Sequence, residues 1–235
     1  MSNNHRKILG IIGGMGPLAT ADLFSKIIAH TKADSDQTHL HILIDNNTDI
    51  PDRTKAILAG GENPLPALIA SAERLRLAGA EFLIMPCNTA HYYYEPLRDA
   101  AGIPVLNMLE ETAVTLKERE IGKIGLLATD GTIRSGVYHR ILGRFGIEIR
   151  TPDEEGQREV MRVIYDVIKA GHADAEISGF RATCESLLND GAETLVLGCT
   201  ELPPAFSRFS LPYNNIDPTL VLAAAAIRYA GAEYI

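Results

Sequence analysis

The chain has 235 residues, of which 46% are hydrophobic, so it is long enough to bury one large α/β core or two small ones. Its formal net charge of −8 and its lack of a basic run argue against nucleic acids and anionic membranes as partners. No apolar stretch approaches the roughly 20 residues of a membrane span. Its three cysteines form no disulfide-like framework, which favours free thiols in a reducing cytoplasm.

Strand-like apolar runs alternate with helical patterns along the whole chain. The predicted strands are 7–12, 40–44, 82–85, 103–105, 123–127, 194–197 and 211–213. The predicted helices are 17–31, 64–78, 90–101, 110–118, 133–143, 155–170, 175–189 and 219–230. This alternation predicts an α/β fold of mostly parallel sheets flanked by helices. In such folds ligands bind at the carboxyl ends of the strands.

Two segments share one pattern, in which Gly-Ala-Glu precedes a short apolar strand that ends at a cysteine. The first segment runs from Gly79 to Cys87 and the second from Gly191 to Cys199. Other strand-like runs around them recur in the same order, which indicates a duplicated unit. We therefore expect two pseudo-symmetric lobes, each with a mostly parallel sheet.

The predicted boundaries of these lobes follow from the two halves of the duplication. The first lobe is expected to comprise residues 1–107 and the second residues 108–213. The last segment, 214–235, contains an apolar helix that we expect to pack back on the first lobe.

The two repeated cysteines are candidates for acid–base chemistry, and their alternative interpretation is as small buried hydrophobic residues. Asn88 and Thr89 follow Cys87 and precede a predicted helix, whose free N–H groups and dipole are expected to lower the pKa of the thiol. The same N–H groups can bind a carboxylate. Two thiols on opposite sides of a substrate suit a reaction that removes a proton from one face of a carbon and returns one to the other. Cys184 lies inside a helical pattern and is interpreted as a packing residue.

Three stretches carry a family resemblance: Gly13 to Pro17, Met85 to His91 and Gly198 to Glu201. In them the chain resembles the aspartate/glutamate racemase family, which needs no pyridoxal phosphate. The similarity covers essentially the whole chain, and through 50–54 and 160–169 it is closest to the aspartate racemases. The resemblance implies a cytoplasmic homodimer without a cofactor. It also implies an active site in the cleft between the lobes and an amino-acid substrate, with aspartate favoured.

The resemblance also implies roles for individual residues. Cys87 and Cys199 would be the catalytic pair, one as the thiolate that removes the α-proton and the other as the thiol that donates to the opposite face. The implied substrate-binding residues are Met15, Arg53, Asn88, Thr89, Ala90, Tyr165, Lys169, Thr200 and Glu201. Arg53 and Lys169 would recognise the second carboxylate of aspartate, which an arginine can grip with two hydrogen bonds. Without the resemblance, these two cations are interpreted as a loop charge and a helix-end lysine.

Several alternatives stay open. A related enzyme of the same family would racemise glutamate or several amino acids. The pattern Gly14-x-Gly16-x-x-Ala19, with Asp45 further on, is a loose match to an NAD(P)-dependent oxidoreductase. A third alternative is an amino-acid-binding module without catalysis. His39 and His41 lack a third ligand at suitable spacing, so no metal site is expected.

Overall fold

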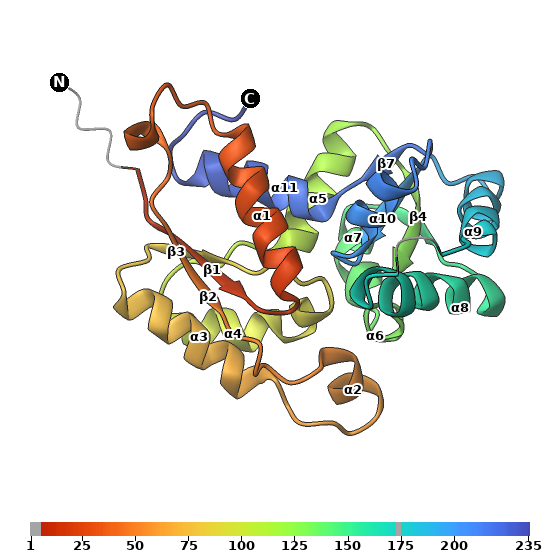
Figure 1. Ribbon diagram of the computed structural model, residues 1–235, viewed down its shortest axis with the longest axis horizontal. Helices are drawn as coiled ribbons and strands as arrows, with labels where there is room; N and C mark the ends of the chain where they lie inside the picture. The colour runs from red at the N-terminus through yellow and green to blue at the C-terminus, as the bar shows by residue number, and fades with distance from the viewer. Residues whose placement is uncertain (1–5, 173–174) are drawn as a thin grey trace.

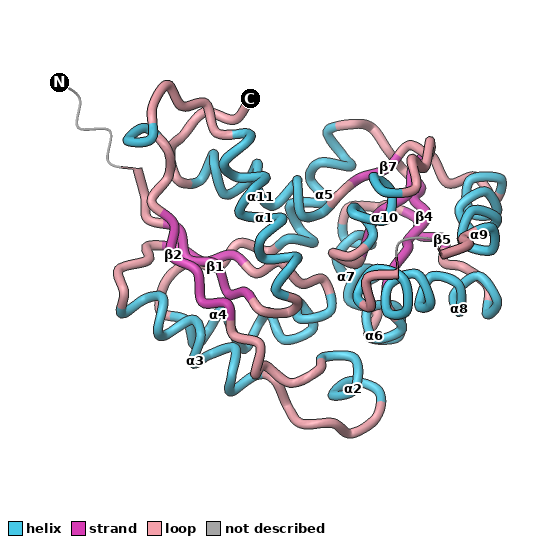
Figure 2. Tube along the Cα trace, viewed as in Figure 1, coloured by secondary structure: helices cyan, strands magenta, loops and turns pink. Residues whose placement is uncertain are grey.

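Two separate parallel β-sheets organise the chain in the computed structural model, which describes residues 6–172 and 175–235 (Figure 1). The first sheet has the strand order β2-β1-β3 and the second has the order β5-β4-β6-β7. Neighbouring strands are parallel in both sheets. Figure 2 shows the two sheets apart from each other, with helices packed around each. The predicted α/β fold with two lobes is therefore confirmed.

The first sheet is built from the N-terminal half of the chain. Its strands and helices are β1 (Leu9–Gly13), α1 (Pro17–His30), β2 (Ile42–Asn46), α2 (Arg53–Leu58), α3 (Leu65–Leu77), β3 (Phe82–Ile84) and α4 (Tyr94–Ala101), with 3₁₀ turns at η1 (Asp36–Thr38) and η2 (Thr89–Tyr93). The central strand β1 is buried at every position, as expected for a strand covered on both faces. Gly14, just after it, has φ of +92°, and a Cβ there would lie 2.2 Å from the carbonyl oxygen of Asn47. Only glycine therefore fits this turn.

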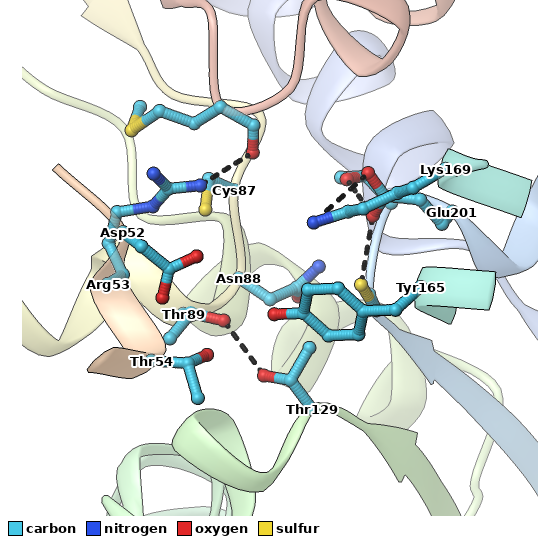
Figure 3. Close-up of a pocket in the computed structure, with 13 residues that line it drawn as sticks. Asp52, Arg53, Thr54, Cys87, Asn88, Thr89, Thr129, Tyr165, Lys169 and Glu201 are labelled. Carbon is cyan, nitrogen blue, oxygen red and sulfur yellow. Dashed lines mark hydrogen bonds and ion pairs between the residues drawn. The ribbon is translucent and has the colours of Figure 1, made fainter. Parts of the chain in front are cut away.

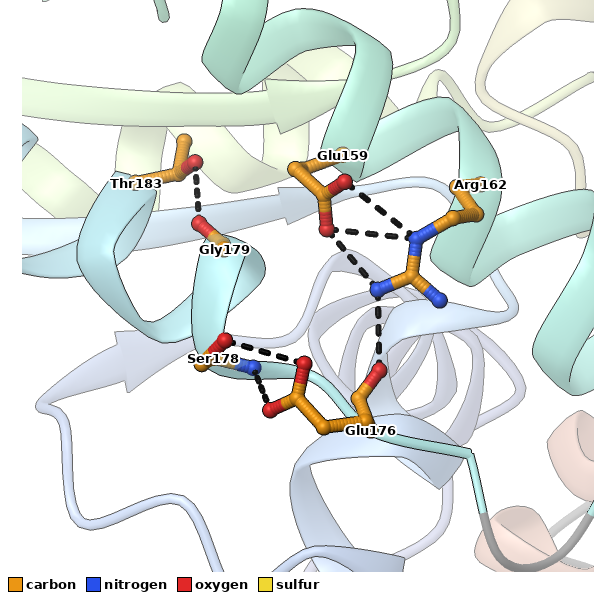
Figure 4. Close-up of polar contacts among 6 residues, drawn as sticks. All are labelled: Glu159, Arg162, Glu176, Ser178, Gly179 and Thr183. Carbon is orange, nitrogen blue, oxygen red and sulfur yellow. Dashed lines mark hydrogen bonds and ion pairs between the residues drawn. The ribbon is translucent and has the colours of Figure 1, made fainter.

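The second sheet follows in the C-terminal half. Its strands and helices are α5 (Met108–Glu118), β4 (Lys123–Ala128), α6 (Asp130–Arg134), α7 (Val137–Arg144), β5 (Glu148–Arg150), α8 (Glu154–Arg162), the π-helix η3 (Val163–Lys169), α9 (Ser178–Asn189), β6 (Thr194–Gly198), α10 (Leu202–Arg208), β7 (Asn215–Ile216) and α11 (Pro218–Tyr229). Arg162 at the end of α8 pairs with Glu159 at 2.8 Å and donates to the carbonyl of Glu176 at 2.9 Å (Figure 4). The carboxylate of Glu176 in turn accepts from the backbone N–H of Ser178, so this cluster links α8 to the start of α9.

Some predicted elements differ from the observed ones. The strand expected at 211–213 is wrong, because Pro212 lacks an N–H for a sheet and β7 forms two residues later. The strand expected at 103–105 is reduced to a single bridge between Leu83 and Val105. The helix expected at 133–143 is two helices, α6 and α7, separated by Gly136 with φ of +65°. The short elements α2, β5 and α10 were not predicted.

The last helix packs against helices of both halves. α11 contacts α1 and α5, and its Leu222 and Ile227 belong to one buried cluster that also includes Leu9 of β1 and Ile124 of β4. An ion pair of 2.7 Å between Lys26 and Asp217 joins α1 to the residue that caps α11. Hydrophobic packing therefore continues between the two lobes, and the lobe boundaries at 107 and 213 stay predictions. Within the described part of the chain, no helix is both long and apolar enough to cross a membrane.

Candidate active site

Both repeated cysteines lie just beyond the carboxyl ends of parallel strands. Cys199 directly follows β6, and Cys87 comes three residues after β3. The exposed fractions of the two residues are 6% for Cys87 and 7% for Cys199, so they are almost equally buried. Both line one cavity of about 330 Å³. Cys184 lies in α9 with no exposed surface, and burial raises the pKa of its thiol to about 12. Both observations agree with its interpretation as a packing residue.

The cavity receives residues from both sheets. Its lining is Met15, Asp52, Arg53, Thr54, Cys87, Asn88, Thr89, Thr129, Tyr165, Lys169, Cys199, Thr200 and Glu201 (Figure 3). All but one of the residues expected at the site are present in this lining. The exception is Ala90, which is completely buried in the first lobe beside the cavity. The structure adds Asp52 and Thr54, which flank Arg53 in sequence, and Thr129, which follows β4 at the edge of the second sheet.

Arg53, the first residue of α2, is held over the cavity by backbone carbonyls. Its Nη1 donates to Ile50 at 3.3 Å and Pro51 at 3.1 Å, and its Nη2 donates to Met15 at 3.3 Å. Nε is buried and has no partner among the described residues. Since a guanidinium has five N–H donors, its Nε–H and one Nη2 hydrogen are not used by these carbonyls. Burial lowers the pKa of Arg53, but the neighbouring Cys87 raises it, and the net shift is upward.

Cys199 has a different neighbour, the carboxylate of Glu201. The thiol donates to Oε2 of Glu201 at 3.0 Å, and the hydroxyl of Thr200 donates to the same oxygen at 3.1 Å. Burial, followed by the negative charge of Glu201, raises the pKa of Cys199 well above its ordinary value. The sequence predicts a lowered pKa for the Cys87 thiol alone, and Cys199 shows the opposite shift. The nearby carboxylate and the loss of solvent outweigh the dipole of the short helix α10.

Lys169 provides a second cation on the Cys199 side of the cavity. Its Nζ lies 3.8 Å from Oε1 of Glu201 and 4.4 Å from the centre of the Tyr165 ring, within the range of a cation–π contact. Burial lowers the pKa of Lys169, but Glu201 and Cys199 raise it, so the net shift is upward and the amine is charged. Figure 3 shows Lys169 and Glu201 on one side of the cavity and Arg53 and Cys87 on the other.

His91 fixes the loop that carries Cys87. Its Nε2 accepts from the backbone N–H of Met108 at 3.1 Å, so the proton is on Nδ1, which donates to the carbonyl of Cys87 at 2.8 Å. Burial lowers the pKa of His91 to about 4, and the ring is neutral. Both ring nitrogens are therefore occupied by backbone groups. His91 therefore has no free nitrogen with which to act as a base toward the Cys87 thiol.

Three buried threonines connect the lobes beneath the cavity. The hydroxyl of Thr89, in η2, lies 3.1 Å from that of Thr129 and 2.8 Å from that of Thr132, and the last two are 3.1 Å apart. Thr129 also caps α6. Since Thr89 follows the first cysteine and the other two residues follow β4, this triangle fixes the two halves of the site relative to each other.

The structure also bears on the metal site and the dinucleotide pattern that the sequence raised. The described residues contain no group of three or more histidine, cysteine, aspartate or glutamate side chains arranged to hold a metal ion. Asp45, the candidate ribose-binding acid, instead pairs with Arg74 of α3 at 2.7 Å.

Known proteins are similar to the chain over nearly its whole length. The sequence model of the Asp/Glu/Hydantoin racemase family matches residues 12–226. The structure of Picrophilus torridus aspartate racemase superposes with a TM-score of 0.83 and 33% identity, covering 97% of this chain and 96% of that one. The broad specificity amino-acid racemase RacX of Bacillus subtilis (strain 168) is 27% identical over 94% of this chain and 96% of its own length. A glutamate racemase of Desulforudis audaxviator is 29% identical over 74% of this chain and 65% of its own length. The chain therefore belongs to the Asp/Glu/hydantoin racemase family, and the protein is an isomerase of the amino-acid racemase class.

Proposed function

We propose that the protein interconverts L- and D-aspartate by proton transfer between Cys87 and Cys199, without a cofactor. The observation that carries this proposal is one cavity, lined by both cysteines, with a different cation on each side of it. The likeness to an aspartate racemase at 33% identity supports the choice of substrate.

The different neighbours of the two thiols suggest their roles in the state that the structure represents. Cys199 is the proton donor, because its thiol already donates to Glu201 and its pKa is raised. Cys87 is assigned as the base, because it lies across the same cavity from Cys199 and beside Arg53. The sulfur of Cys87 takes the α-proton, the electron pair of the C–H bond stays on the substrate, and the S–H proton of Cys199 moves to the opposite face of the carbon. The roles then exchange for the other enantiomer.

The carbanion intermediate needs hydrogen-bond donors around the α-carboxylate, where its charge spreads. Asn88, Thr89 and Thr200 supply polar groups on the loops beside the cysteines. The side-chain carboxylate of aspartate has a separate partner in Arg53, whose Nε–H and one Nη2 hydrogen are not used by the backbone carbonyls around it. Lys169 contributes a second positive charge to the same cavity.

A broader substrate range is the second candidate, and the similarity to a broad specificity racemase favours it. Glutamate differs from aspartate by one methylene, and a pocket distinguishes such a pair by only about 1–3 kcal/mol. Comparing kcat/KM for aspartate, glutamate and alanine separates the two candidates. Aspartate is expected to be the best of the three by at least about tenfold.

The deciding experiment is proton NMR of L-aspartate in D₂O with reduced enzyme, together with Cys87→Ser and Cys199→Ser variants. We expect loss of the α-proton signal and formation of D-aspartate, abolished or made one-directional by either substitution. Each serine variant is a matched control for the other, because the two positions are buried to the same extent. Exchange that survives in both serine variants would contradict the two-cysteine mechanism. An absence of exchange with aspartate would contradict the substrate.

Two further properties are proposals that rest on the family resemblance. We propose a homodimer, which light scattering on the eluting protein would detect as twice the mass of the 25.5 kDa chain. We also propose a cytoplasmic location, since all three cysteines are free thiols, which a reducing compartment preserves. A monomer at micromolar concentration, or recovery of the native protein outside the cytoplasm, would contradict these proposals.

A further inference from the structure

One side chain in the cavity has an unused hydrogen-bond donor. Asn88 is 2% exposed, and its Nδ2 is buried without a partner among the described residues. Figure 3 shows this nitrogen directed into the cavity. A buried donor without a partner costs about 1–3 kcal/mol, so its persistence calls for an explanation. A substrate oxygen at this position would satisfy it.

The other end of the same amide is fixed from the second lobe. The hydroxyl of Tyr138, in α7, donates to Oδ1 of Asn88 at 2.6 Å. Tyr138 has no exposed surface, and burial raises the pKa of its hydroxyl, which is therefore protonated at all physiological pH values. A protonated buried hydroxyl needs an acceptor, and only the oxygen end of an amide can accept. The tyrosine thus excludes the flipped amide and turns the NH₂ group toward the cavity.

The position of this hydrogen bond ties it to the reaction. Asn88 directly follows Cys87 on the first lobe, whereas Tyr138 belongs to the second lobe. The amide orientation therefore depends on the two lobes being in the arrangement that also brings the cysteines to one cavity.

We propose that Tyr138 is a positioning residue, which holds the Asn88 amide so that its NH₂ group donates to a substrate carboxylate between the two cysteines. The proposal rests on the proposed function for the identity of the substrate. The hydrogen bond itself and its effect on the amide do not depend on that identity.

The test is a double-mutant cycle on kcat/KM for aspartate, with Tyr138→Phe, Asn88→Ala and the combined variant. Tyr138→Phe is expected to lower kcat/KM by roughly ten- to a hundredfold in the parent enzyme, as expected for a lost charge-assisted contact. In the Asn88→Ala background the same change is expected to have less than a twofold effect. An equal loss in both backgrounds would mean that Tyr138 does not act through Asn88, and would overturn the proposal.

Tyr94→Phe is the matched control. Tyr94 is also buried, and its hydroxyl donates to the carbonyl of Val105 at 2.9 Å, away from the cavity. The two tyrosine variants lose one buried hydrogen bond each, so they are expected to lose similar stability, but only Tyr138→Phe should lose activity. Asn88→Asp is a second variant that leaves Tyr138 intact and replaces the NH₂ group by an oxygen. Full activity of Asn88→Asp would show that the donor is not needed.

A spectroscopic measurement tests the hydrogen bond without any substrate. In ¹⁵N-labelled protein, the side-chain NH₂ signals of Asn88, assigned through Asn88→Ala, are expected to shift or broaden in Tyr138→Phe and not in Tyr94→Phe. Unchanged signals would overturn the proposal. If the parent enzyme racemises no aspartate, the proposed function fails, while these signals still decide whether Tyr138 holds the amide.

Discussion

Arg53→Met tests the recognition of the second carboxylate most directly. Methionine keeps much of the length of the side chain and removes the charge and every donor. The hydrogen bonds of Arg53 to three backbone carbonyls leave two N–H groups for a carboxylate. At about 1.5–3 kcal/mol for each hydrogen bond to a charged group, their loss costs roughly 3–6 kcal/mol of binding in the transition state. At 1.36 kcal/mol for each factor of ten, kcat/KM for aspartate is expected to fall by about 10² to 10⁴.

Part of that loss has another origin, because Arg53 also lies beside the proposed base Cys87. Alanine has no second carboxylate, so its α-proton exchange in D₂O reports the effect on Cys87 alone. The ratio of the losses for aspartate and alanine then isolates the carboxylate contact. Arg74→Met is the control, since Arg74 is paired with Asp45 outside the cavity, and is expected to change neither rate more than twofold. Equal losses for aspartate and alanine would refute the assignment of Arg53 to the side-chain carboxylate.

Three further predictions follow from burial and charge. Iodoacetamide at neutral pH is expected to modify Cys87 before Cys199, because the two residues are almost equally buried but the Cys199 thiol donates to the carboxylate of Glu201. Mass spectrometry of the peptides shows the order of modification. The reverse order would contradict the assigned roles. In the folded protein the pKa of His91 is lowered from 6.5 to about 4, so unfolding takes up a proton and the free energy of unfolding falls as the pH drops through this window. Urea titrations should show a loss of about 2 kcal/mol in the free energy of unfolding between pH 6.5 and pH 5. The same loss should be absent in His91→Gln. Gly14→Ala is expected to lower the free energy of unfolding by about 3 kcal/mol or more, because the added Cβ collides with the backbone of Asn47. Gly136→Ala is expected to lower it by only about 1 kcal/mol, because the added Cβ meets open space. Equal melting temperatures of the two variants would contradict this prediction.

The sequence predicted the position of both cysteines because the signal for them is local. A short apolar run with a polar loop after it marks the carboxyl end of a buried strand, and parallel pairing brings such ends to one edge of a sheet. The two copies of the pattern then placed Cys87 and Cys199 beyond the carboxyl ends of related strands, β3 and β6. Short elements with polar composition have no comparable signal. β5 has the sequence Glu-Ile-Arg at the edge of its sheet and was missed for this reason.

The electrostatics of the site could not be predicted from the sequence in the same way. The helix-terminus argument concerned only the helix that follows Cys87, and it left out the Glu201 side chain, which turns back to accept a hydrogen bond from Cys199. The role of Tyr138 could not be predicted from the sequence either. A tyrosine in a helical pattern is ordinarily interpreted as a core residue, and its hydrogen-bond partner Asn88 lies far away in the sequence. Contacts that depend on side-chain direction across two lobes require the folded chain.

The two repeated cysteines have different charged neighbours in the structure. This difference matters for a reaction that runs in both directions. Arg53 lies beside Cys87, whereas the Cys199 thiol donates to Glu201 and has a raised pKa, so the free site favours a protonated Cys199. In the two-cysteine mechanism that we propose, turnover in the other direction requires an anionic Cys199 beside the carboxylate of Glu201. Lys169, 3.8 Å from that carboxylate and charged, is placed to offset the repulsion. In the mechanism that we propose, the Lys169 cation therefore serves both an acidic substrate and an anionic Cys199, which ties the choice of substrate to the ability to work in both directions.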